Sequence, residues 1–171
     1  MTAVDRGRFW LPVVAGMGVA VGLGVYGRLH QPAVVVVETG AYLRLQTVKA
    51  WLATAVVLLV VVQAAAAFLR HRRPGTRWPA ALHWWSGRLA LALSLPVAAH
   101  CLYALGIHAL DGRVLGHALC GCLFYGAFVT RTLLRARSWA VPVAGGVAFA
   151  ALVGVWLLSA LWFFGTVGAT F

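Results

Sequence analysis

Five long apolar stretches, separated by short segments that carry arginine, constrain the fold of this chain more than any other feature. They lie at about residues 9–26, 49–69, 80–106, 114–134 and 141–164. A helix needs about 20 consecutive apolar residues to cross the hydrocarbon layer of a bilayer. Because 63% of the residues are hydrophobic and only 10% are charged, too little polar sequence remains to cover five buried helices in a soluble protein. The sequence therefore predicts an all-α integral membrane bundle of five transmembrane helices, folded as one domain over residues 1–171.

The distribution of arginine and lysine predicts the orientation of these helices. Nine cations occur before the first helix, in the second loop and in the fourth loop, whereas four occur in the first loop (residues 27–48) and on the rest of the opposite side. Loops rich in positive charge stay in the cytoplasm. We therefore predict a cytoplasmic N-terminus and an external C-terminus. The formal net charge of +11 then reflects topology and not a nucleic-acid partner, because the cations are dispersed over several loops.

Two histidines lie inside predicted helices near the external face. His100 is roughly 9 Å inside the third helix and His117 roughly 5 Å inside the fourth, at 1.5 Å per residue. Ionisable side chains are costly in the hydrocarbon layer and are usually functional there. Two neutral imidazoles at similar depth on antiparallel helices can ligate one haem iron, and without a Cys-x-x-Cys-His motif that haem would be a non-covalent haem b. The alternative is that the two histidines bond to each other or to backbone carbonyls.

Arg88 and His83 are further candidates for cofactor contacts, toward the cytoplasmic end of the third helix. Arg88 could bind a haem propionate or the carbonyl of a quinone, and its alternative is to extend toward the membrane surface. His83 with His71 could hold a second haem. The alternative for His83 is an interfacial position beside Trp84 and Trp85.

His30 and His108 lie in the predicted external loops. His30 could contact the edge of a haem, replace His117 as a ligand, or protonate a quinol product. The sequence does not select among these roles. His108 is predicted to be a surface residue.

Three cysteines, Cys101, Cys120 and Cys122, define a rival hypothesis, because they gather at the same predicted end as the two histidines. Thiolates and imidazoles together suit copper or zinc, although Cys-x-Cys on a helix directs its thiols to different faces. There are two alternatives to metal binding. Cys101 could form a disulfide with Cys120 or Cys122, or all three cysteines could be small buried side chains. The second hypothesis is therefore a copper-handling assembly protein. The third is a structural accessory subunit without a cofactor, consistent with a first helix whose Gly18-x-x-x-Gly22 step allows close helix packing.

A family resemblance covers most of the chain. It is carried by GRLHxP at residues 27–32, HxxxGR at 83–88, LPVAxHC at 95–101, GCxFYGAF at 121–128 and SALW at 159–162. In these motifs the chain resembles a small actinobacterial family of membrane proteins of unknown function, which implies a location in the bacterial cytoplasmic membrane.

A looser resemblance links the HxxxGR motif and the histidine-bearing bundle to cytochrome b561 and the ferric-reductase-like membrane cytochromes. Those families imply haem b and transmembrane electron transfer. The chain departs from their pattern of two histidines about four turns apart on each paired helix, since His83 and His100 are 17 residues apart and point about 100° apart around a helix.

These observations predict a b-type cytochrome that holds one haem b, or two if His83 also binds one. It would pass electrons between the quinone pool, or another donor, and a redox partner. We expect an electron-transfer subunit of a respiratory complex and not a stand-alone enzyme, with the lipid bilayer and other subunits of that complex as its partners.

Overall fold

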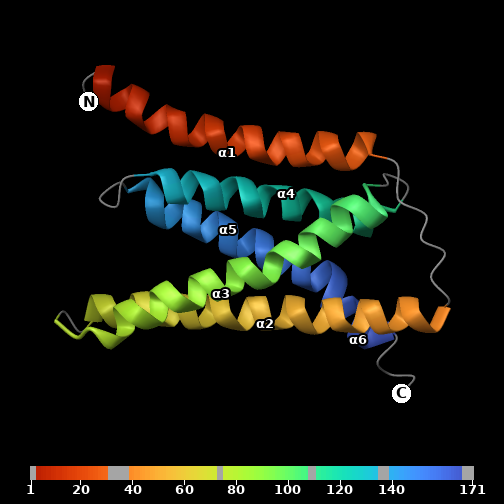
Figure 1. Cartoon of the computed structure of the whole chain (residues 1–171). Helices are drawn as coiled ribbons and strands as arrows, with labels where there is room; N and C mark the ends of the chain where they lie inside the picture. The colour runs from red at the N-terminus through yellow and green to blue at the C-terminus, as the bar shows by residue number, and fades with distance from the viewer. Residues whose placement is uncertain (1–2, 31–38, 73–74, 108–110, 135–138, 167–171) are drawn as a thin grey trace. The chain divides into compact units, whose positions relative to one another are not determined.

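The structure is a computed structural model, and it describes residues 3–30, 39–72, 75–107, 111–134 and 139–166. All five apolar stretches are helical, and these described ranges contain no strand. In chain order the helices are α1 (Ala3–Leu29), α2 (Thr39–Arg72), α3 (Trp78–His100), α4 (Gly112–Leu133), α5 (Ala140–Trp156) and α6 (Trp162–Thr166), coloured along the chain in Figure 1. Two π-helical segments, η1 (Cys101–Leu105) and η2 (Leu157–Leu161), continue α3 and α5 without a break. The prediction of an all-α chain is confirmed.

Four helical segments in the described part of the chain are long and apolar enough to cross a membrane. They are Phe9–Leu29, Leu45–Arg72, Gly112–Leu133 and Ala140–Thr166. The segment α3 does not reach the same apolar character, because His83, Ser86 and Arg88 interrupt its first half. The chain is therefore a helical protein with membrane-spanning character in four segments.

The first predicted loop, residues 27–48, is shorter than expected. Helix α1 continues to Leu29, and α2 already begins at Thr39, so residues 39–48 are helical. Hydropathy marks only the part of a helix that suits hydrocarbon, whereas the backbone hydrogen bonds continue through polar residues such as Gln46 and Thr47. Arg44, predicted in the loop, consequently belongs to α2, as does Lys49, which was predicted as the first residue of the second helix.

The chain divides into two compact units. Unit 1 comprises residues 1–33 and 102–158, and unit 2 comprises residues 34–101 and 159–171. In unit 1, α1 and α5 both pack on α4; in unit 2, α2 packs on α3 and α6 contacts α2. His117 therefore belongs to unit 1 and His100 to unit 2. The predicted single domain over residues 1–171 stays a prediction.

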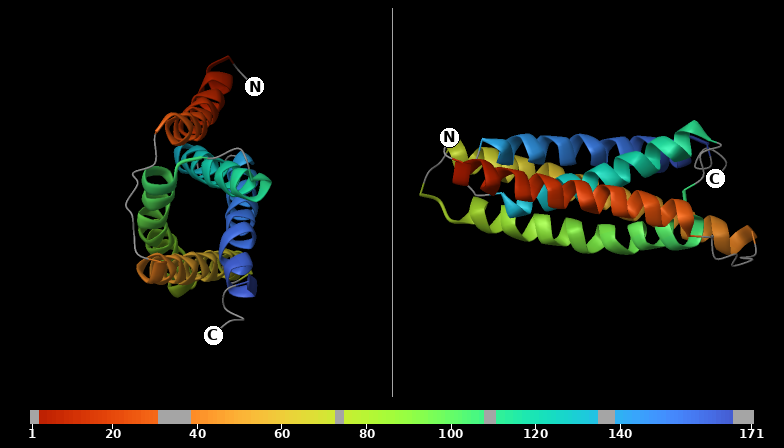
Figure 2. Two further views of the ribbon diagram at one scale, coloured as in Figure 1. Left: turned by 90° about the vertical axis from the view of Figure 1, so that its right-hand side faces the viewer. Right: turned by 90° about the horizontal axis from the view of Figure 1, so that it is seen from above.

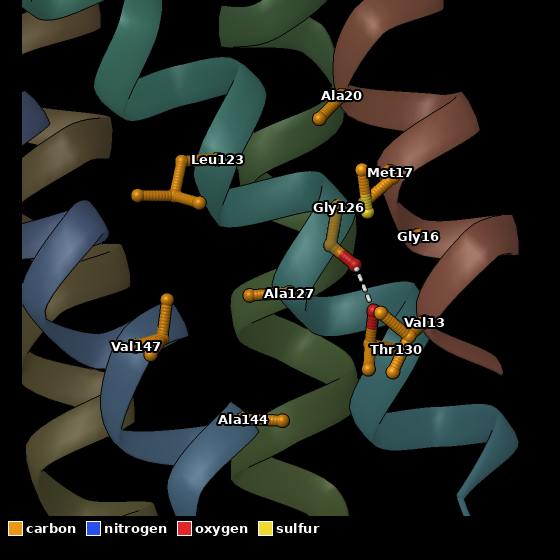
Figure 3. A pocket seen from close by; sticks show the side chains of 10 residues that line it. All are labelled: Val13, Gly16, Met17, Ala20, Leu123, Gly126, Ala127, Thr130, Ala144 and Val147. Atoms are coloured by element: carbon orange, nitrogen blue, oxygen red, sulfur yellow. Dashed lines mark hydrogen bonds between the residues drawn. The ribbon is translucent and has the colours of Figure 1, made fainter. Parts of the chain in front are cut away.

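Unit 1 contains a close crossing of α1 and α4, drawn in Figure 3. A Cβ atom on Gly126 would lie 2.7 Å from the carbonyl oxygen of Gly16 and 2.8 Å from Cβ of Ala20. The Thr130 hydroxyl donates to the Gly126 carbonyl at 3.0 Å. Gly18 and Gly22, in contrast, have no described atom within 4 Å of an added Cβ. Within the described residues, the close approach to α4 is therefore made at Gly16 and not at the predicted Gly18–Gly22 step. The reason is that a helix directs residues 16 and 18 to different faces.

Unit 2 is a hairpin of α2 and α3, which lie side by side in Figures 1 and 2. Gly75, in the turn between them, has φ = 99°, a left-handed conformation that glycine adopts without strain. The buried face of α3 consists of Pro79, Ser86, Ala90 and Ser94. These small residues allow the two helices to approach closely.

Candidate functional site

His117 lies in α4 and its side chain is directed at α5. Its Nδ1 atom is 3.3 Å from the carbonyl oxygen of Val155. A carbonyl oxygen only accepts hydrogen bonds, so Nδ1 carries the proton and the ring's lone pair lies on Nε2. Metal-ligating histidines commonly donate their second ring N–H to a carbonyl in this way, which fixes the tautomer and the ring direction. The local geometry of His117 therefore fits a haem ligand.

Arg113 lies one helical turn before His117 and makes a second polar contact near the end of α5, with the π-helix η2 that continues it. Its Nη1 donates to the carbonyl of Leu158 at 3.0 Å. Asp111 caps the start of α4 by accepting from the Arg113 backbone N–H at 2.8 Å, and its carboxylate lies 3.7 Å from the guanidinium. Two donors from α4 thus reach carbonyl groups where α5 changes into the π-helix η2. This pair of bonds also fits a purely structural role for His117, in which it fastens α4 to α5.

His100 is the last residue of α3 and is half-buried. The π-helix η1 follows directly, and such segments occur frequently at functional sites. Lys49 of α2 lies within electrostatic reach of both His100 and Cys101. Lys49 was not predicted as a site residue. The available signal was that it is the only lysine among fourteen cations.

His83 faces α2 in unit 2. Its Nδ1 lies 3.0 Å from the backbone carbonyl of Gln63, so this histidine also carries its proton on Nδ1. His71 is exposed, eight residues beyond Gln63, which corresponds to about 12 Å along the axis of α2. The structure therefore does not bring the rings of His83 and His71 to the same level of the hairpin.

Arg88 is exposed on α3, and its guanidinium carbon lies 3.2 Å above the centroid of the Trp84 ring. The adjacent Gly87 faces α2, where the Gln63 amide occupies the place that a Cβ would take. Gln63 thus serves the α2–α3 contact twice, through its carbonyl to His83 and through its amide to Gly87.

We expect Gly87→Ala to lower the free energy of unfolding by about 1 kcal/mol, because the new methyl group must displace the Gln63 amide. In a Gln63→Ala background the same change should be close to neutral, since the obstructing group is absent. Denaturation of the purified protein in mixed detergent and dodecyl sulfate micelles measures both values. Equal effects of Gly87→Ala with and without Gln63 would contradict the described contact.

His30 lies between two tyrosine rings in unit 1. Its ring centroid is 5.0 Å from that of Tyr26 and 4.9 Å from that of Tyr103. The Nε2 atom is buried and has no hydrogen-bond partner among the described residues. His30 directly follows α1, and its backbone N–H donates to the Tyr26 carbonyl at 2.8 Å. His108, predicted to be a surface residue, lies outside the described residues.

The three cysteines are free thiols. The Sγ atom of Cys120 lies 2.9 Å from a Cβ placed on Gly154 of α5, whereas Sγ of Cys122 lies 3.9 Å from one placed on Gly24 of α1. The two thiols therefore point to different neighbouring helices, as predicted for Cys-x-Cys on a helix. Within the described ranges, no three histidine, cysteine or acidic side chains are placed to share a metal ion.

Two apolar grooves occur in unit 1. The first, of about 210 Å³, lies beside the Gly16–Gly126 crossing and is shown in Figure 3. The second, of about 530 Å³, lies between α1 and the first half of α4 and includes Arg28 and Cys122 in its lining. His117 lines neither groove, because its ring is directed at α5.

Among known proteins, one family model matches the chain. A model described as a family of unknown function, DUF6529, matches residues 9–171. The chain belongs to this family. No curated protein and no solved structure matches the chain. The DUF6529 match confirms the predicted resemblance to a family of unknown function, while the likeness to cytochrome b561 stays a prediction.

Proposed function

We propose that this DUF6529 protein is a b-type cytochrome subunit of a membrane redox complex, with His100 and His117 as the axial ligands of one haem b. The observation that most supports this proposal is the bond from His117 Nδ1 to the Val155 carbonyl. It orients the ring and fixes the tautomer with the proton on Nδ1, which is the arrangement common among metal-ligating histidines. We propose His100 as the second ligand because the sequence predicts it at a depth similar to that of His117 on the preceding helix.

The residues around the two histidines have distinct roles in this proposal. A haem held by two imidazoles supplies one-electron transfer and has no open position for oxygen chemistry. Arg113 holds the last helix through the Leu158 carbonyl and so supports the Val155 carbonyl that orients His117. Lys49, within electrostatic reach of His100, is a candidate partner for a propionate group.

Electron transfer across the whole membrane needs a second component, because one haem near one face does not bridge about 30 Å of hydrocarbon. We propose a diffusing quinone or another subunit as that component; a second haem at His83 would need a second ligand other than His71. Arg88 and His30 remain candidates for propionate or quinone contacts.

We also propose α3 as a fifth span, with the N-terminus in the cytoplasm of a bacterial cell and the chain in its cytoplasmic membrane. The support is its antiparallel pairing with α2. Gln63 contacts His83 near one end of α3, while Lys49 is near His100 at the other end. The 14 residues from Lys49 to Gln63 correspond to about 21 Å of helix, so α3 follows most of a membrane-spanning helix.

An absorption spectrum of the purified protein tests the haem proposal. The chain is expressed with a haem precursor in the medium, purified in mild detergent and measured before and after reduction with dithionite. We expect a Soret band, a sharp α-band after reduction, and about one haem b per chain by the pyridine haemochrome method. A colourless protein that is folded and monodisperse would overturn the proposal.

A cofactor-free accessory subunit is the second candidate function. It is favoured by the paired contacts of Arg113 and His117 with the last helix, which provide a structural reason for both residues without a ligand. This candidate predicts the colourless outcome. Copper bound in stoichiometric amount would support the metal-handling alternative instead.

A further inference from the structure

A stripe of exposed residues runs along α3 on the side away from α2. The stripe begins at Arg77, which precedes the first turn of α3. Trp84 follows 7 residues later and Arg88 follows 11 residues later, so all three fall within about 40° of one another around the helix. The buried residues of α3, such as Ser86 and Ala90, lie on the opposite side and face α2. We call Arg77, Trp84 and Arg88 the cationic stripe.

The Arg88 side chain is held in one direction within this stripe. Its guanidinium lies 3.2 Å above the Trp84 ring, one turn toward the start of α3. Stacking on an aromatic ring uses the face of the guanidinium, so the N–H donors in its plane are directed outward. In the part of the chain that the structure describes, no carboxylate or carbonyl oxygen pairs with this group.

The anion that would pair with Arg88 must come from outside the hairpin. Residues 39–110 contain seven arginine and lysine residues but no aspartate or glutamate. The whole chain has only three acidic residues, and Asp111 is already engaged with Arg113. An exposed and stacked guanidinium without an acidic neighbour has the charge and the planar donors that recognise a phosphate group.

The same side of α3 becomes apolar beyond Arg88. Ala92, Leu95 and Ala99 continue the stripe and are exposed, Leu95 by 53%. From Arg88 to Ala99 the helix rises about 16 Å, close to half of the hydrocarbon layer of about 30 Å. One surface thus offers a cation over an aromatic ring at one end and an apolar track one acyl chain long at the other.

We infer that Arg88 and Trp84 form a binding site for the phosphate group of an anionic phospholipid, whose acyl chain lies along Ala92, Leu95 and Ala99. Trp85, exposed by 59%, lies next to Trp84 in the chain, and Trp78, exposed by 52%, lies about 15 Å from Arg88 toward the start of α3. Such amphipathic rings are typical of the level of lipid headgroups. Arg77, in the same stripe, adds positive charge that favours an anionic over a zwitterionic headgroup. This inference does not rest on the proposed haem ligands His100 and His117, and it assigns a lipid phosphate to Arg88 in place of the propionate or quinone.

Native mass spectrometry of the full chain tests the inference, with phosphatidylglycerol and phosphatidylcholine of the same acyl chains titrated into the detergent. We expect wild-type protein to retain phosphatidylglycerol in preference, and Arg88→Gln to weaken its apparent affinity about tenfold. Arg88→Lys should lose part of that affinity, because lysine keeps the charge but lacks the planar fork. Inorganic phosphate should not displace the lipid, since it lacks the acyl chain.

Arg72→Gln is the matched control. Arg72 is also exposed in unit 2 and lies 4.8 Å over the ring of Phe68, but it stands outside the stripe. Its loss should change phosphatidylglycerol affinity less than twofold. Equal losses in both glutamine variants, equal retention of the two lipids by wild type, or unchanged binding by Arg88→Gln would each overturn the inference. If Arg88→Gln bound lipid as wild type does but lost a co-purified subunit, Arg88 would be assigned to a carboxylate of that subunit instead.

Discussion

Alanine in place of His117 or His100 is expected to lower the haem content of the purified protein more than tenfold. Loss of a hydrogen-bonded partner of a metal ligand already lowers metal affinity about 10- to 100-fold, so loss of the ligand itself should have a larger effect. The measurement is the Soret absorbance per chain together with the haemochrome assay. In the His117 variant the hydrogen bond from Nδ1 to the Val155 carbonyl is also lost, so folding must be measured on the same sample.

Two comparisons separate ligand loss from unfolding. His71→Ala is the control, because His71 is exposed at the end of α2 and should keep the wild-type spectrum. In His117→Gly and His100→Gly, added imidazole should restore the reduced α-band if the protein is folded and only the ligand is missing. Full haem retention by either alanine variant, at unchanged thermal stability, would remove that histidine from the ligand set.

The helices were predictable from the sequence because their cause is local. A run of apolar residues of sufficient length predicts a helix in lipid whatever its neighbours are, and all five runs are helical. Helix ends were less accurate, as the early start of α2 at Thr39 shows. Hydropathy reports the limit of the hydrocarbon, whereas backbone hydrogen bonds set the limit of the helix.

The contacts of the site residues were not predictable, because they depend on which helix packs on which face. The sequence placed His117 inside a helix but contained no sign that its partner is the Val155 carbonyl. Likewise, His30 was predicted in a loop without the Tyr26 and Tyr103 rings that enclose it. Lys49 was predicted only as the first residue of a helix, and its place within electrostatic reach of His100 depends on the pairing of α2 and α3.

The α1–α4 crossing shows the same dependence and leads to the largest expected loss of stability. We expect Gly126→Ala to lower the free energy of unfolding by about 1–3 kcal/mol. Its methyl group would meet the carbonyl oxygen of Gly16 at 2.7 Å and Cβ of Ala20 at 2.8 Å. A backbone oxygen cannot rotate away as the Gln63 amide can beside Gly87, so α1 and α4 themselves must separate.

Gly121→Ala on the same helix is the control, because no described atom lies within 4 Å of its added Cβ. It should be neutral or stabilise by up to about 1 kcal/mol, since alanine has the higher helix propensity. Gly16→Ala disturbs the same crossing from α1, so its effect should not add fully to that of Gly126→Ala. Unfolding in mixed micelles, followed by tryptophan fluorescence, measures all three. If Gly126→Ala were as stable as Gly121→Ala, α1 would not approach α4 at Gly16, and unit 1 would need another arrangement of its first helix.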